Sequence, residues 1–151
     1  MNTMRLFLDT EFNGFGGELL SVALVPQDPE VAEFYCEIEH TPSEMVQWVK
    51  DNVIGVMDGE PVPYEAFQFQ LQRYINQFTD IEIVVDWPDD IGYFCAALIT
   101  APGEQIMLPG PINFRLDCSL DYFSEVPHHA LHDARGIRDS FVKRAEFTEP
   151  D

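Results

Sequence analysis

Basic residues are scarce in this chain of 151 amino acids. It has eight Lys and Arg against 27 Asp and Glu, which gives a formal net charge of -19. A protein that follows DNA or RNA over a long track neutralises the phosphates with a stripe of Lys and Arg. The composition therefore argues against extensive coverage of a nucleic acid, although it leaves room for contact with one end.

Cysteines and long apolar runs are also few. The three cysteines, Cys36, Cys95 and Cys118, are widely spaced and form no Cys-x-x-Cys pair, so neither a disulfide framework nor a zinc site is indicated. No apolar run approaches the ~20 residues that a membrane span needs. The first ten residues, MNTMRLFLDT, lack the pattern of a signal peptide. We therefore expect one domain over residues 1–151, located in the cytoplasm and without membrane contact.

What the sequence does contain predicts an α/β fold. Strands are expected at 5–9, 19–25 and 31–38, with short connections that favour an antiparallel meander. A nearly continuous apolar run at 81–85 is typical of a central strand covered on both faces. The remaining expected elements are helices at 42–52, 63–78, around 91–98 and after Pro127, and short strands at 105–108 and 113–116.

Two carboxylates follow the first apolar segment. Asp9 ends this predicted strand and Glu11 comes two residues later, so both side chains point from one face of the extended backbone. Carboxylate oxygens are the ligands that Mg²⁺ and Mn²⁺ prefer in proteins. The Asp-x-Glu pattern alone is weak, because short acidic pairs are common at strand ends and in loops.

A third acid ends the predicted strand at 81–85. Asp86 lies close to Asp9 if the two strands are parallel neighbours, because ligands of open α/β sheets bind beyond the carboxyl ends of strands. The alternative role for Asp86 is that of an ordinary turn residue. Asp89 and Asp90 precede a helix, where acids cap the first turn, and we leave both out of the site. For Trp87, a structural, half-buried role is favoured over base stacking.

The last segment combines an apolar stripe with histidines and acids. Asp133 falls off the stripe in the early turns of the predicted helix, and His128 stands at or before its first turn. Both side chains are therefore free to reach the same space. Four of the eight cations follow within a short distance: Arg135, Arg138, Lys143 and Arg144. They are either phosphate contacts or charges that suit the helix dipole.

Taken in order, DTEF, the strand-end Asp86 and HHALHDA resemble the three motifs of the DnaQ-like DEDDh 3′–5′ exonucleases. The resemblance runs from Asp9 to Ala134, and its last motif is the most specific. It implies a ribonuclease H-like mixed sheet, with three antiparallel strands followed by parallel strands, flanked by helices. Within that family the chain looks most similar to the short bacterial and phage-type exoribonucleases, because it has no appended domain.

The resemblance also implies roles for individual residues. By similarity, Asp9, Glu11, Asp86 and Asp133 are the ligands of two Mg²⁺ or Mn²⁺ ions, and His128 is the general base. Such an enzyme releases nucleoside 5′-monophosphates from the 3′ ends of single-stranded RNA. His129 stands three intervening residues before Asp133, the spacing of the tyrosine-using branch, and is the alternative base.

Substrate contacts and partners complete these expectations. Phe12 and Leu20 are candidates to wedge against the terminal base and sugar, although a place in the core is favoured for Leu20. Arg135 is a candidate phosphate contact. RNA ends are the favoured partner; the oligomeric state stays open, with a homodimer as one candidate because similar exoribonucleases often pair. An exodeoxyribonuclease with the same site is one alternative, since the choice turns on the 2′-hydroxyl. A non-catalytic acidic mimic of nucleic acid is the other.

Overall fold

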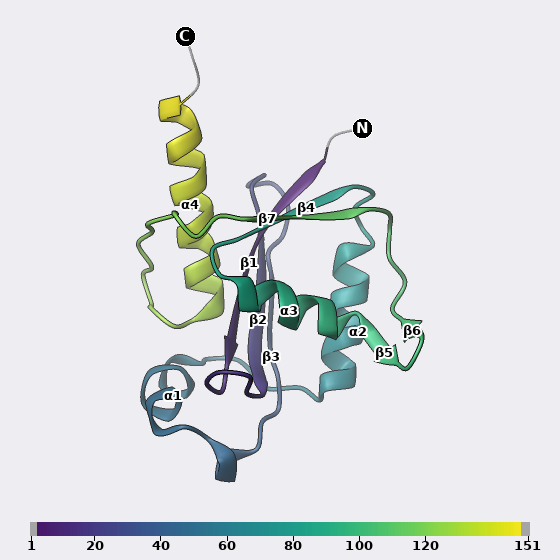
Figure 1. Cartoon of the computed structure of the whole chain (residues 1–151), viewed down its shortest axis with the longest axis vertical. Coiled ribbons are helices and arrows are strands. Elements are labelled where there is room, and N and C mark those ends of the chain that lie inside the picture. Colours follow the sequence, from purple (N-terminus) through teal and green to yellow (C-terminus); the bar gives the residue numbers. More distant parts are fainter. Residues whose placement is uncertain (1–2, 149–151) are drawn as a thin grey trace.

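A computed structural model describes residues 3–148 and contains a five-stranded mixed sheet (Figure 1). The strand order is β3-β2-β1-β4-β7. The strands are β1 (Met4–Phe12), β2 (Leu19–Pro26), β3 (Phe34–Glu37), β4 (Ile81–Val85) and β7 (Ile112–Leu116). The first three are antiparallel neighbours, whereas β4 runs parallel to both β1 and β7. The expected ribonuclease H-like arrangement of the sheet is confirmed.

Helices cover both faces of the sheet. On one face, α2 (Tyr64–Ile75) and α3 (Pro88–Ala97) pack against strand residues that include Leu6 and Leu8. On the other face, α4 (Ala130–Thr148) packs against a second set that includes Phe7. The alternation of side chains along β1 therefore separates two cores. It also places Asp9 and Glu11 on the α4 face of the sheet, with Phe7.

Smaller elements fill the connections. Between β3 and α2 the chain makes an excursion that contains η1 (Pro42–Glu44), α1 (Gln47–Asn52) and η2 (Ile54–Val56). Val49 and Val53 of this excursion pack on Leu20 in a third apolar cluster. A two-stranded ribbon of β5 (Ile99–Ala101) and β6 (Glu104–Gln105) follows α3. No helix within residues 3–148 is long and apolar enough to cross a membrane.

The single helix expected at 42–52 is wrong, because the segment forms two short helices with extended backbone between them. Met45 and Val46 have ψ angles of 127° and 135°. The Asn13 side chain stabilises this break: its amide N–H donates to the Glu44 carbonyl, and its carbonyl accepts from the Val46 N–H, both at 2.9 Å. A partner distant in sequence thus satisfies backbone groups that a continuous helix would have paired.

Three other expected bounds also differ. The strand expected at 31–38 starts at Phe34, because Asp28 organises a turn by accepting hydrogen bonds from the N–H groups of Glu30 and Val31. The strand expected at 105–108 is reduced to the short β6, and β5 was not expected. The first strand continues past Asp9 to Phe12, because its pairing with β2 persists to that point.

Candidate active site

Strand register brings Asp9 and Asp86 together. The parallel pairing of β1 with β4 ends with Phe7 opposite Val84, and Asp9 and Asp86 each lie two residues further along. Asp9 therefore stands where the parallel pairing ends, although β1 itself continues. The carboxyl ends of parallel strands are the usual binding edge of an open α/β sheet.

The described structure gathers five carboxylates into two overlapping groups. Oxygen atoms of Asp9, Glu11 and Asp133 lie within 4.8 Å of one another, as do oxygens of Asp9, Asp86 and Asp90. The four carboxylates predicted from the sequence are thus brought together. Asp9 belongs to both groups, which makes it the centre of the cluster. Asp90 is an addition, because its place before a helix pointed to capping alone.

Mutual repulsion and burial change the acidity of this cluster. Burial, followed by the charge of Glu11, raises the pKa of Asp9 well above its usual value. Burial and the nearby Asp133 raise the pKa of Glu11 to about 9. Burial also raises the pKa of Asp86 and brings that of Asp90 to about 7. In the absence of a cation, Glu11 therefore holds a proton at neutral pH.

The cluster fits divalent cations. Besides the close carboxylate oxygens, Oδ2 of Asp9 is buried and has no hydrogen-bond partner within residues 3–148. A buried polar atom without a partner costs free energy, and a bound cation would satisfy this one. An all-oxygen set of ligands suits Mg²⁺ or Mn²⁺ rather than zinc, which binds nitrogen and sulfur more often.

His128 faces the carboxylates. It lines the same cavity of about 530 Å³ as Asp9, Glu11, Asp86 and Asp133. Its backbone N–H donates to Oδ2 of Asp133 at 3.2 Å. The residue has a φ of +68°, a left-handed conformation that is uncommon outside glycine. Such strain persists only where the surrounding structure holds the residue in place.

His129 points elsewhere. It is buried, it does not line the carboxylate cavity, and its Nε2 lies 2.8 Å from Oδ1 of Asp58. Its ring also stacks on Tyr35, with centroids 4.8 Å apart. The sequence alone left His128 and His129 open as candidate bases. The geometry favours His128, because it alone of the two reaches the cavity.

Aromatic side chains form the rim of the cavity. Phe15, Trp48 and Trp87 all line it, with 97%, 54% and 57% of their surfaces exposed. Trp87 is therefore more exposed than the half-buried indole that was expected, and its indole N–H donates to Oδ2 of Asp89 at 3.2 Å. Phe15 sits between Gly14 and Gly16, which both have positive φ angles, so a tight glycine turn presents it. Trp48 was missed because α1 carries no recognisable motif.

Tyr122 is a further lining residue that the sequence did not indicate. Burial, followed by the charges of Asp9 and Asp133, raises its pKa, so the phenol stays protonated. The segment that carries Tyr122 lies tightly against α4: a Cβ added at Gly136 would stand 2.3 Å from the Phe123 carbonyl oxygen. Only glycine allows this approach, a signal that a sequence by itself does not reveal.

Of the two side chains predicted to contact the terminal base and sugar, one lines the cavity and the other is buried. Phe12 lines the cavity and stacks on Tyr93, with ring centroids 4.5 Å apart. Leu20 is fully buried beneath α1. The core position favoured for Leu20 is therefore confirmed and its contact with substrate is wrong, because no part of the side chain is accessible to a ligand.

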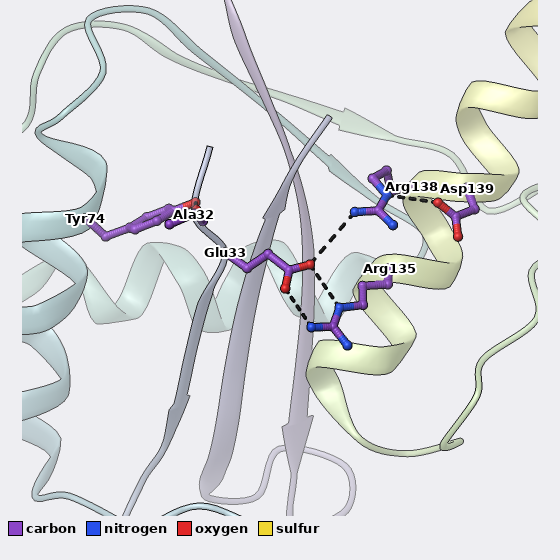
Figure 2. A network of polar contacts seen from close by, with 6 residues as sticks. All are labelled: Ala32, Glu33, Tyr74, Arg135, Arg138 and Asp139. Carbon is purple, nitrogen blue, oxygen red and sulfur yellow. Dashed lines mark hydrogen bonds and ion pairs between the residues drawn. The ribbon is translucent and has the colours of Figure 1, made fainter. Parts of the chain in front are cut away.

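Arg135 also lies away from the cavity. Figure 2 shows its guanidinium paired with Glu33 through two hydrogen bonds, of 2.9 and 2.7 Å. Arg138 approaches the same carboxylate and also pairs with Asp139. Arg144 pairs with Asp117. The described residues that line the cavity include no Lys or Arg. The prediction that Arg135 contacts phosphate in this cavity is therefore wrong.

Comparison with known proteins adds no relative. No protein-family model matches the chain, and no curated protein matches it significantly.

Proposed function

We propose that the protein is a metal-dependent 3′–5′ exonuclease that acts on single-stranded ends and favours RNA. One observation carries the proposal: carboxylates from β1, β4 and α4 meet a histidine in one cavity. This set offers oxygen ligands for cations and a base beside them. Phosphodiester hydrolysis needs both functions.

The charge of the site supports dependence on metal. Six acids line the cavity, including Asp89, and none of the described lining residues is Lys or Arg. A phosphate would be repelled by this surface alone. When bound, divalent cations such as Mg²⁺ or Mn²⁺ neutralise this charge and stabilise the attacking and leaving oxygens of the phosphoryl group. Substrate binding is then expected only when cations are present.

The chain's own residues divide the remaining work. Asp9, shared by both carboxylate groups, would hold the cations together with Glu11 and Asp133 on one side and Asp86 and Asp90 on the other. The imidazole of His128 would accept a proton from the attacking water. The phenol of Tyr122, which stays protonated, is a hydrogen-bond donor beside the carboxylates.

The aromatic rim supports single-stranded substrates. Base stacking on an exposed aromatic ring contributes ~1–3 kcal/mol and requires unpaired bases. Phe15, Trp48 and Trp87 offer such rings around one opening. An enzyme that grips one end of a strand needs no basic track, which reconciles the proposal with the net charge of -19.

Burial of the carboxylates also favours an enzyme over an acidic mimic of nucleic acid. A mimic displays its charges to a basic partner, whereas Asp9, Asp90 and Asp133 are each buried. An exodeoxyribonuclease stays the nearer alternative.

The direct test offers 5′-labelled RNA and DNA strands to the protein with Mg²⁺ or Mn²⁺. We expect a ladder that shortens from the 3′ end, faster for RNA, and that disappears in Asp9→Asn. The matched control is Asp89→Asn, an acid of the same cavity that belongs to neither carboxylate group, and it should stay active. Failure to shorten either strand under these conditions would refute the proposal.

A further inference from the structure

A second polar cluster lies beside the carboxylate cavity and joins three segments of the chain. Glu37 of β3 is buried, and its Oε2 accepts hydrogen bonds from the backbone N–H groups of Asp58 and Gly59, at 3.0 and 2.9 Å. The Tyr35 hydroxyl donates to the same oxygen. Glu37 thereby ties the end of the excursion between β3 and α2 to the sheet.

Asp58 extends this cluster to the segment before α4. Its Oδ1 lies 2.8 Å from Nε2 of His129, although the Asp58 side chain is 71% exposed and that of His129 only 2%. His129 packs between the rings of Tyr35 and His132, with centroid distances of 4.8 Å to each. The imidazole is therefore held firmly, and the Asp58 carboxylate caps it from the solvent side.

Hydrogen bonding explains this cluster better than a metal does. Ligand atoms of Glu37, Asp58 and His129 lie within 4.8 Å of one another. Three donors already occupy the Glu37 oxygen, however, and Asp58 bonds directly to His129. A metal-bound histidine normally donates its second ring N–H to an acceptor. Nδ1 of His129 has no partner within residues 3–148.

The pair stands between two residues of the candidate active site. His128, next to His129 in the chain, lines the carboxylate cavity, and Trp48 precedes Asp58 by ten residues in the same excursion. Their rings meet edge to face, with centroids 4.9 Å apart. The backbone thus connects His129 to His128 directly, and it connects Asp58 to Trp48 through the excursion.

We propose that Asp58 and His129 are positioning residues, a latch that holds His128 against Trp48 over the carboxylate cavity. His128 needs such support, because a residue with a φ of +68° keeps this strained backbone only where the surrounding structure holds it in place. The effect of the latch on turnover rests on the proposed function, in which His128 is the base. Its effect on the contact between His128 and Trp48 does not depend on that function.

Asp58→Ala is the sharpest variant. It removes the carboxylate that holds His129, yet it keeps the two backbone N–H groups that bind Glu37, so the excursion stays attached to β3. Glu60→Ala is the matched control, because Glu60 is an exposed acid two residues further along the same loop. In a Trp87→Phe background, Trp48 is the single tryptophan, and acrylamide quenching of its fluorescence reports its accessibility.

We expect Asp58→Ala to make Trp48 more accessible to acrylamide. The turnover number should fall on the order of 10-fold to 100-fold, as misplacement of a catalytic group does, with unchanged affinity for Mn²⁺. His129→Gln keeps a side-chain N–H donor for Asp58 and should retain most of the turnover. Glu60→Ala should change neither readout.

The two proposals fail in different ways. Unchanged quenching of Trp48 in Asp58→Ala overturns the latch, whatever the nuclease assay shows. Increased quenching with full turnover overturns its role in positioning the base, and so does a loss of turnover in His129→Gln while Trp48 stays packed. If the unaltered chain degrades no strand but Asp58→Ala still increases the quenching of Trp48, the latch is supported and the nuclease proposal fails.

Discussion

The Thr10 hydroxyl donates a hydrogen bond of 2.5 Å to Oδ1 of Asp90, across 80 residues of sequence. Both residues are buried. The bond joins β1 to the first turn of α3 and brings Asp90 to the carboxylate cluster around Asp9 and Asp86. The second carboxylate oxygen of Asp90 stays available for a cation. An acid in the first turn of a helix, where it suits the helix dipole, is thus also a candidate metal ligand.

Thr10→Val tests this hydrogen bond. Valine keeps the shape of threonine but removes the donor, which leaves a buried acceptor unsatisfied at a cost of ~1–3 kcal/mol. We expect the free energy of unfolding to fall by that amount in chemical denaturation at neutral pH. Thr10→Ser, which keeps the hydroxyl, is the control. Equal losses in the two variants would assign the effect to packing instead.

Stability of the metal-free protein should decrease as pH rises. Folding raises the pKa of Glu11 from 4.5 to about 9, so the folded state binds more protons than the unfolded state between these values. The free energy of unfolding therefore falls across that window. Melting temperatures measured in a chelator from about pH 5 to about pH 9 should show this decline.

Two additions to that experiment identify its cause. Glu11→Gln should flatten the decline, whereas Glu104→Gln, at an exposed position on β6, should leave it unchanged. Mn²⁺ should raise the melting temperature most at high pH, because a ligand that binds only the folded, ionised cluster stabilises it by mass action. A decline of the same slope in Glu11→Gln would contradict the assignment.

His128→Asn should abolish most turnover without unfolding the chain. Removal of a general base typically costs ~10²–10⁴ in rate, and asparagine tolerates the left-handed backbone better than alanine does. The measurements are kcat and the thermal unfolding midpoint. His40→Gln provides the control, because His40 lies outside the cavity. Full activity in His128→Asn would rule out His128 as the base.

Trp48→Ala should weaken binding of single-stranded ends. Loss of one stacking surface costs ~1–3 kcal/mol per base, which would appear as a higher KM for single-stranded substrate. Phe147→Ala is the control, because it removes an aromatic ring that is even more exposed than Trp48 but lies near the end of α4. Similar effects of the two variants would argue against a specific stacking surface.

Arg135→Ala should leave KM for nucleic acid unchanged. Its guanidinium is already paired with Glu33, as Figure 2 shows, and it lies outside the cavity. Partly exposed ion pairs contribute about 0–1 kcal/mol, so the unfolding midpoint should move little. A large rise in KM would restore Arg135 as a phosphate contact.

Periodicity along the chain predicted the large elements well. The apolar runs of β1, β2 and β4 and the apolar stripe of α4 all reflect burial that is repeated along one segment. The excursion at 38–62 was predicted poorly, because Asn13 and Glu37 determine its conformation from outside it. Neither contact leaves a repeating pattern in the local sequence.

The sequence by itself determined the α/β class, the antiparallel meander and the residue types of the candidate site, because these follow from local patterns of polarity and from short motifs. Only the tertiary structure decided which histidine faces the carboxylates, that Asp90 joins them, and that Leu20 and Arg135 do not line the cavity. These distinctions depend on contacts between segments far apart in the chain. They are set by strand register, the left-handed backbone at His128 and the partners of each side chain.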